Sequence, residues 1–192
     1  MKGVIPLETY FISDLHFGHL NCFKYDKRPF QTLEEQDEHI ISKWNEQVGK
    51  YDCVWILGDV SWYNPQKTIE ILMRLNGIKN LCIGNHDNKL IKDKDFRNQF
   101  NEITPYKELY LDKKTTLVLC HYPIPCFNKH LYGGYHFYGH VHNSLEDEIT
   151  NKHKEMLIQE LGKPCNMFNV GVMMPYINYQ PQTFKHIIES SK

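Results

Sequence analysis

The sequence predicts an α/β fold in which two mixed β-sheets pack as a sandwich flanked by helices. Five short apolar runs have the length and composition of buried strands, and each is followed by Asp, His, Asn or Gly. These runs are Thr9–Ser13, Cys53–Leu57, Asn80–Ile83, Thr115–Cys120 and Tyr135–Tyr138. Helical patterns alternate with the early runs, which favours α/β layers. In such folds ligands bind beyond the carboxyl ends of the strands, where the polar residues of this chain lie.

Two helices are predicted between the early strands. The first begins at the capping box Thr32-Leu33-Glu34-Glu35. Its apolar stripe consists of Ile40, Ile41, Trp44 and Val48. The second runs from Asn64-Pro65, where proline suits the first helical position, to Gly77. Its predicted buried face consists of Ile69, Leu72, Met73 and Leu75.

The later part of the chain is predicted to contain a hairpin and a surface helix. Glu108–Asp112 and Thr115–Cys120 flank the polar turn Asp112-Lys113-Lys114, a pattern typical of antiparallel strands. The charged run Glu146–Lys163 contains apolar residues at helical spacing. We therefore expect an amphipathic surface helix there, without a functional role.

Length and composition favour one cytoplasmic domain spanning residues 1–192. The chain is 41% hydrophobic, which is enough for one continuous core. Lys and Arg total 22 against 23 for Asp and Glu, so no global attraction to nucleic acid or membrane is expected. No apolar stretch approaches the roughly 18 residues that span a bilayer. The six cysteines form no CxxC pair and are expected to be buried free thiols, which fits a reducing compartment.

Five polar clusters follow the predicted strands and together indicate a metal site. They are Asp14-Leu15-His16, Gly58-Asp59, Gly84-Asn85-His86-Asp87, Cys120-His121 and Gly139-His140-Val141-His142. Each cluster alone has an ordinary explanation as a turn, a helix cap or a structural histidine. Their common position and their oxygen and nitrogen donors favour metal binding. Alternate residues of an extended chain point to the same side, so Asp14 and His16 can chelate one ion, and His140 and His142 are expected to share a face.

The ordered set of clusters resembles the signature of the calcineurin-like metallophosphoesterases, and it spans most of the chain, from Asp14 to His142. The opening Asp-Leu-His-Phe-Gly-His and the later Asn169-Val170-Gly171-Val172 further resemble a small bacterial and phage branch of predicted phosphoesterases. The resemblance implies a four-layer αββα architecture. It also implies hydrolysis of a phosphate ester by a metal-bound hydroxide.

Two divalent metal ions are implied by the same resemblance. One would be bound by Asp14, His16, Asp59 and His142, and the other by Asp59, Asn85, His121 and His140, with Asp59 as the bridge. Only two of these seven side chains are negative, so the loaded site would stay positive and attract a phosphate ester. The mixed donors suit Mn²⁺, which is the expected metal, and Fe²⁺, Co²⁺, Ni²⁺ or Zn²⁺ are alternatives.

Further residues are candidates for catalysis and substrate binding. His86 is predicted to hydrogen-bond the phosphate or to protonate the leaving oxygen. Asp87 is predicted either to orient His86 or to cap a turn. Asn85 and His19 are expected to reach the substrate, and an exposed loop histidine is the alternative for His19. The loop Tyr122–Tyr135 is expected to select the substrate, and Lys24–Phe30 is predicted to be a solvated loop rather than a basic contact for a nucleotide.

The expected substrate is a small or nucleotide-like phosphodiester. A monoester carries a second negative charge that favours an Arg or Lys near the metals, and the motif loops contain none. Arg28 and Lys129 are the nearest candidates in neighbouring loops. A phosphomonoesterase is the first alternative, and a metal-poor interaction scaffold of the same fold is the second. The near-neutral charge argues against long nucleic acid, no membrane partner is expected, and the sequence does not indicate an oligomeric state.

Overall fold

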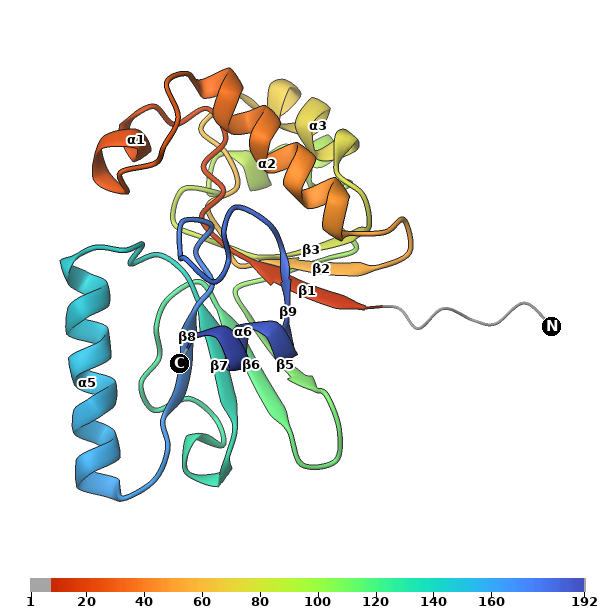
Figure 1. Cartoon of the computed structure of the whole chain (residues 1–192). Coiled ribbons are helices and arrows are strands. Elements are labelled where there is room, and N and C mark those ends of the chain that lie inside the picture. Colours follow the sequence, from red (N-terminus) through yellow and green to blue (C-terminus); the bar gives the residue numbers. More distant parts are fainter. Residues whose placement is uncertain (1–7, 192) are drawn as a thin grey trace.

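Two β-sheets lie at the centre of the molecule (Figure 1). The computed structural model describes residues 8–191, so the ends of the predicted 1–192 domain lie outside the described residues. The first sheet has the strand order β4-β3-β2-β1-β9 and the second the order β5-β6-β7-β8. The first contains β1 (Thr9–Ile12), β2 (Cys53–Ile56), β3 (Ile78–Cys82), β4 (Glu102–Thr104) and β9 (Gln182–Thr183). The second contains β5 (Tyr106–Tyr110), β6 (Thr116–Cys120), β7 (Tyr135–Tyr138) and β8 (Asn166–Asn169).

Both sheets are mixed, as predicted. The strands β1 to β4 are parallel, and β9 pairs with β1 in the antiparallel direction. In the second sheet β5 and β6 form the predicted antiparallel hairpin, and β6, β7 and β8 are parallel. The chain beyond β1 also meets the chain beyond β8, through a bridge between Ser13 and Gly171. The carboxyl ends of strands from both sheets therefore come together.

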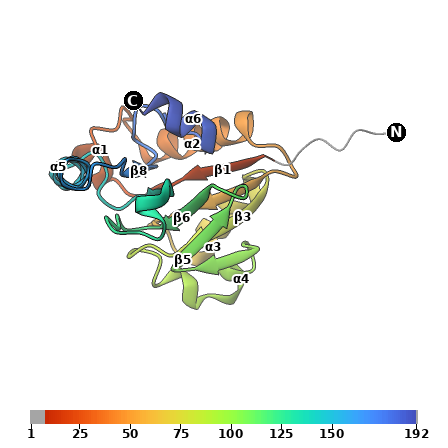
Figure 2. The same ribbon diagram turned by 90° about the horizontal axis from the view of Figure 1, so that it is seen from below.

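Helices flank the sandwich. In Figure 1, α2 (Leu33–Gln47) and α3 (Pro65–Arg74) lie over the first sheet, and α5 (Leu145–Leu161) stands beside β8. Figure 2 shows α5 end-on at this side, and α6 (Phe184–Ser190) contacts β1 and β9. The remaining helical turns are short: α1 (Asn21–Tyr25), η1 (Leu90–Lys92), α4 (Lys94–Arg97) and η2 (His130–Tyr132). The predicted arrangement of two mixed sheets flanked by helices is confirmed.

The predicted helix starts agree with the observed caps. Thr32 Oγ1 accepts a hydrogen bond from the backbone N–H of Glu35 at the start of α2. Asn64 Oδ1 accepts one from the backbone N–H of Lys67 at the start of α3, where Pro65 occupies the first turn. Each cap satisfies a backbone donor that the helix itself leaves unpaired.

The main buried cluster joins residues of both sheets with the inner faces of α2 and α3. The ring of Phe11 from the first sheet meets the ring of Phe137 from the second, with centroids 5.1 Å apart. Leu117 and Leu119 of β6 belong to the same buried cluster, whereas Val118 belongs to a smaller cluster that includes Phe127. Successive residues of β6 thus serve opposite faces of the second sheet, as strand geometry requires.

The predicted buried face of α3 is wrong at one residue. Met73 is 73% exposed, whereas Ile71 is buried. Residues 68, 72 and 75 follow the spacing of one helix face, and position 73 lies about 100° away from position 72. The core-facing stripe therefore excludes Met73.

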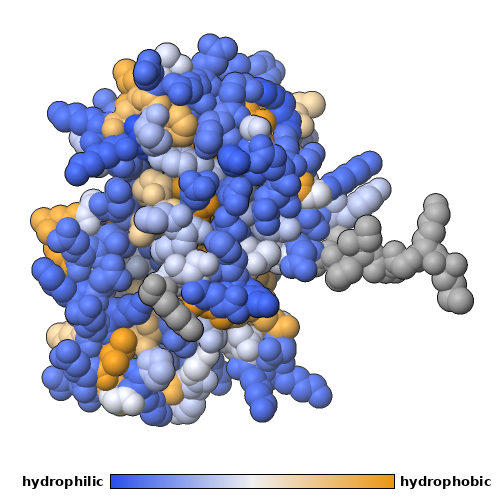
Figure 3. All heavy atoms as spheres, viewed as in Figure 1, coloured by the Kyte–Doolittle hydropathy of each residue, from blue (hydrophilic) through white to orange (hydrophobic). Residues whose placement is uncertain are grey.

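The cysteines and the surface agree with most of the remaining expectations. All six cysteines are free; four are buried, Cys53 is partly buried, and Cys126 is exposed against expectation. The face seen in Figure 3 carries scattered hydrophobic patches among hydrophilic residues. Among residues 8–191, no helix combines the length and the apolar character needed to cross a membrane.

Candidate metal centre

The five predicted clusters occupy loops that follow β1, β2, β3, β6 and β7 and converge at one place. On one side, Nε2 of His16 lies 3.1 Å from Nε2 of His142. Nε2 of His142 lies 3.6 Å from Oδ1 of Asp14. One donor atom from each of these three residues falls within 4.8 Å of the other two, which is close enough to share an ion.

The other side of the cluster is built around Asn85. Its Oδ1 lies 2.9 Å from Nε2 of His121 and 3.0 Å from Nδ1 of His140. Nε2 of His121 also lies 3.5 Å from Oδ2 of Asp59. The same Asp59 oxygen lies 3.6 Å from Nε2 of His16, on the first side. The carboxylate of Asp59 therefore lies between the two groups, as a bridging ligand would.

Backbone conformation aims these side chains inward. Five of the seven candidate ligands have positive φ angles, between 49° and 71°: Asp14, His16, Asp59, His140 and His142. The left-handed region is costly for residues other than glycine, and such residues cluster at functional sites. The expectation that Asp14 and His16 lie together as alternate residues of an extended strand is wrong in its geometry. The strand β1 ends at Ile12, and left-handed turns bring Asp14 and His16 together.

Glycines in front of the candidate ligands let the loops pack closely. A Cβ at Gly84 would collide with the carboxylate of Asp59, and a Cβ at Gly139 would collide with the carboxylate of Asp14. These glycines are thus required by the close approach of neighbouring loops rather than only by a turn.

The electrostatics of the cluster favour a bound cation. Burial opposes ionisation of Asp59, but the hydrogen bond and charge of His121 hold the pKa of this carboxyl well below its usual range. Burial also opposes protonation of His121, yet its hydrogen bond to Asp59 and the charge of Asp14 raise its pKa to about 9. Two carboxylates, an amide oxygen and several imidazole nitrogens facing one space therefore form a donor set that fits divalent ions of the Mn²⁺ to Zn²⁺ series.

A buried ion pair supports the residues around Asp14, His16 and His142. Oδ1 of Asp26 accepts a hydrogen bond of 2.7 Å from Nδ1 of His142. The guanidinium of Arg28 donates to Oδ2 of Asp26 and to the backbone carbonyls of Asp14 and Leu15. Asp26 and Arg28 are 5% and 4% exposed. The prediction of a solvated loop over Lys24–Phe30 is therefore wrong for these two residues, because their charges pair with each other and with the metal-site loops.

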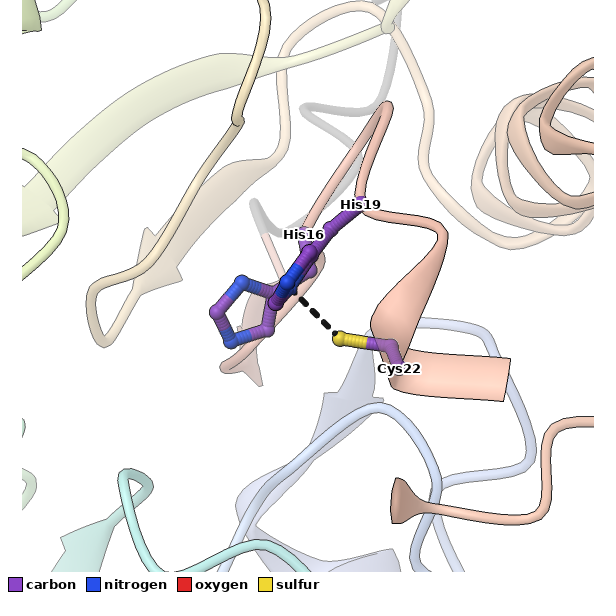
Figure 4. A group of neighbouring side chains, drawn as sticks. All are labelled: His16, His19 and Cys22. Atoms are coloured by element: carbon purple, nitrogen blue, oxygen red, sulfur yellow. Dashed lines mark hydrogen bonds between the residues drawn. The ribbon is translucent and has the colours of Figure 1, made fainter. Parts of the chain in front are cut away.

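Figure 4 shows how His19 lies beside His16 and Cys22. Nδ1 of His19 is 2.9 Å from Sγ of Cys22, and burial raises the pKa of that thiol to about 12. These three residues also form a group with spacing suitable for a metal ion. His19 is half-buried, so the simple exposed-histidine interpretation does not describe it.

Trp62 joins three of the histidines. Its ring stacks on His19 with centroids 4.1 Å apart, and the ring of His86 is 4.7 Å away on a tilt. Its indole N–H donates a 3.0 Å hydrogen bond to Nδ1 of His16. Sequence reasoning did not single out Trp62. Its only sequence signal is its position three residues after Asp59, beyond a buried strand.

His86 and Asp87 have different surroundings. The side chain of His86 is 40% exposed, and its Nε2 lies 4.0 Å from Oδ2 of Asp59, at the open side of the cluster. The carboxylate of Asp87 is buried and accepts hydrogen bonds from the backbone N–H groups of Asp59, Val60 and Gly84. Among the described residues, no hydrogen bond joins Asp87 to the ring of His86. The contacts of Asp87 match the turn-capping alternative.

The segment after β8 supports the cluster as well. Nδ2 of Asn169 donates a 2.7 Å hydrogen bond to the backbone carbonyl of His142. Backbone hydrogen bonds join Ser13 to Val170 and Val172. The Asn-Val-Gly-Val segment thus ties the His142 loop to the end of β1. The predicted rim loop also borders the site, because the exposed ring of Tyr122 lies 4.7 Å from the ring of His140.

Comparisons with known proteins agree with this geometry. Residues 7–163 match the family model described as calcineurin-like phosphoesterase. An uncharacterised protein of Methanocaldococcus jannaschii, MJ1445, is 31% identical over 95% of this chain and 90% of its own length. The gene 66 protein of Mycobacterium phage L5 is 39% identical over 41% of this chain and 39% of its own length.

The fold also has a counterpart among solved structures. A protein of unknown function from Aquifex aeolicus, AQ665, superposes with a TM-score of 0.63 and 21% identity, covering 96% of this chain and 100% of the other. That likeness concerns the fold. The family match covers most of the chain and includes all seven candidate ligands. The chain therefore belongs to the calcineurin-like phosphoesterase family and is a metal-dependent hydrolase of phosphate esters.

Proposed function

We propose that the protein is a dinuclear phosphodiesterase acting on a small or nucleotide-like substrate. The observation that carries the proposal is the position of Asp59, whose Oδ2 lies within 3.6 Å of an imidazole on each side of the cluster. Asp14, His16 and His142 would hold one ion with Asp59. Asn85, His121 and His140 would hold the other with Asp59. Two bound cations would supply an activated water and positive charge for the phosphoryl oxygens.

Three side chains at the open side are assigned to the substrate in this proposal. His86 is exposed and faces the cluster, so it is placed to hydrogen-bond the phosphate or to protonate the leaving oxygen. His19 is half-buried, with its Nδ1 2.9 Å from Sγ of Cys22, so its other ring nitrogen, Nε2, is proposed to contact the substrate. The amide of Asn85 is half-buried at the same opening. Asp87 acts indirectly, because its carboxylate accepts hydrogen bonds from the backbone N–H groups of Asp59 and Gly84 and so holds the two loops together.

The surroundings of the two candidate cations support a diester substrate. Arg28 is turned inward, but its guanidinium is committed to Asp26, Gln36 and two backbone carbonyls. Lys129 is exposed, and its Nζ lies 5.7 Å from the ring centroid of Tyr132. Neither side chain is placed to offset the second charge of a monoester.

We further propose that the protein works with Mn²⁺, as one domain, in a reducing compartment. The mixed donor set supports Mn²⁺ as the working metal, with Fe²⁺, Co²⁺, Ni²⁺ or Zn²⁺ as alternatives. We also propose that residues 1–192 form one catalytic domain. The six free cysteines support a reducing cytoplasm as the site of action.

The test compares two nitrophenyl substrates on the Mn²⁺-loaded protein. We expect kcat/KM for bis-p-nitrophenyl phosphate to exceed that for p-nitrophenyl phosphate. A monoester turned over at least about tenfold more efficiently, a difference of about 1.4 kcal/mol in transition-state stabilisation, would replace the phosphodiesterase by a phosphomonoesterase.

A further inference from the structure

A cleft opens beside the candidate metal centre. It has a volume of about 550 Å³ and is lined by residues 61–65 and by residues 85, 86 and 88–90. Asn85 and His86 therefore line both the cleft and the centre. We propose that this cleft binds the nucleotide unit of the substrate, an inference that rests on the proposed phosphodiesterase function.

The size and the walls of the cleft suit a nucleobase with its sugar. Ligand sites commonly measure about 300–1,000 Å³ and combine apolar walls with a few polar groups. Here Trp62 and Tyr63 supply aromatic surface, and Pro65 and Leu90 supply aliphatic surface. Trp62 is 49% exposed, an unusual fraction for so large a ring. Aromatic surface of this kind favours a flat base, because stacking on an aromatic side chain contributes about 1–3 kcal/mol per base.

The polar groups of the cleft suit the edges of a base and an anionic ligand. The side chains of Asn64 and Asn88 offer amide groups, which can both donate and accept hydrogen bonds. Lys89 is exposed and is the one lysine or arginine among the described lining residues. No Asp or Glu lines the cleft in the part of the chain that the structure describes. The cleft therefore favours a nucleotide over a neutral or cationic ligand.

The position of the cleft links this ligand to the chemistry. The side chain of His86 lies between the cleft and Asp59, with its ring 4.7 Å from that of Trp62. A nucleotide whose base lies in the cleft can therefore direct its phosphate past His86, toward the two candidate metal groups. The predicted rim loop Tyr122–Tyr135 does not line this cleft, so base recognition is assigned to the loops after β2 and β3.

Tryptophan fluorescence provides a binding test that needs neither metal nor turnover. Trp44 and Trp55 are buried in the core, so Trp62 is the exposed tryptophan of the three. Adenosine and adenosine 5′-monophosphate are expected to quench its emission saturably. Ribose 5-phosphate, which lacks the base, is expected to leave the emission unchanged. The variant Trp62→Phe must lose the quenching signal; quenching that persists in it would place the ligand elsewhere and overturn the proposal.

A charge-reversal pair tests the role of Lys89. In Lys89→Glu we expect adenosine 5′-monophosphate to bind roughly fivefold more weakly, while adenosine binds nearly as before. Lys92→Glu makes the same charge change three residues away, at an exposed position outside the cleft, and should bind both ligands normally. Equal weakening in the two variants would show a general charge effect and contradict the assignment of Lys89.

The two proposals fail differently. Absent quenching by both adenosine ligands, in protein that hydrolyses bis-p-nitrophenyl phosphate with Mn²⁺, would overturn the nucleotide cleft and leave the phosphodiesterase intact. Saturable quenching in protein that hydrolyses no diester with any of the candidate metals would support the cleft and overturn the proposed function.

Discussion

The two sides of the candidate metal centre differ in how they are supported. On the Asp14 side, both Asp14 and His16 are buried, and the buried pair Asp26 and Arg28 braces the loops from behind. His142 on the same side is half-buried; on the Asn85 side His121 is buried, whereas Asn85 and His140 are half-buried. The ring of His140 packs against Tyr122, which is 44% exposed. The Asp14 side is thus braced by a buried ion pair, whereas two of the three residues on the Asn85 side are half-buried.

We expect the two sides to differ in how tightly they hold their ions. Hydrogen-bonded partners behind a ligand fix its orientation and strengthen metal binding. We therefore expect the Asp14 side to retain its ion firmly. The Asn85 side, next to His86 and the proposed nucleotide cleft, is expected to exchange its ion more readily and to meet the substrate.

Removing the shared carboxylate of Asp59 should weaken metal binding on both sides of the centre. Asp59→Ala is expected to lose both ions and nearly all activity, because the group between the two sets of donors is gone. Asn85→Ala removes a neutral ligand from the open side and should keep the ion on the Asp14 side. Metal content and the rate at saturating Mn²⁺ measure both effects. If Asp59→Ala kept two tightly bound ions and near-normal turnover, Asp59 would not be the bridge.

A substitution on the open side should affect chemistry rather than metal content. His86→Ala is expected to keep both ions and to lose roughly 10²–10⁴ in rate on substrates with a poor leaving group. The loss should shrink with a nitrophenolate leaving group, which needs no proton. An equal loss on both substrates would favour phosphate binding over proton donation by His86.

A substitution behind the braced side should affect one ion only. Asp26→Asn keeps the shape of the side chain but removes the charge that holds His142. We expect affinity for one of the two ions to fall roughly 10–100-fold, with the other unchanged. Asp52→Asn, an acid-to-amide change at a carboxyl that caps the turn before β2, serves as the control. Equal weakening of both ions would contradict the independence of the two sides.

Asp87 should matter for stability more than for the leaving group. Its carboxylate satisfies three buried backbone N–H groups from the loops after β2 and β3. Each buried donor left unpaired costs about 1–3 kcal/mol, so Asp87→Ala should lower the free energy of unfolding by at least that amount. Denaturant unfolding of the metal-free protein measures the change. A variant of normal stability with the leaving-group dependence of His86→Ala would instead make Asp87 the partner of His86.

The candidate metal ligands, which lie close together in the structure, were proposed from the sequence, but Trp62 and the residues that support the ligands were not. The strands before the clusters were visible as apolar runs, and Tyr135–Tyr138 matches β7 in full. Strands β4, β8 and β9 are short or partly polar and lack that signal. Asp26 and Arg28 stand in a charged segment, which by composition indicates a solvated loop. Only the fold reveals that they pair beneath the metal site.

The backbone conformation of the ligand loops could not be predicted from the sequence either. The spacing of Asp14 and His16 correctly indicated that the two side chains lie together. The reason is a pair of left-handed residues beyond the end of β1, not the alternation of an extended strand. Left-handed Asp and His residues carry no composition signal comparable to that of glycine, so tertiary contacts decide this conformation.

Metal titration of the stripped protein tests the central claim most directly. The protein is treated exhaustively with a chelator, and Mn²⁺ is then added while bound metal and hydrolysis of bis-p-nitrophenyl phosphate are followed together. We expect no activity in the metal-free protein and two Mn²⁺ ions bound per chain at saturation. Activity should return as these two ions bind. Undiminished activity after chelation, or full activity with one ion per chain, would contradict the dinuclear centre.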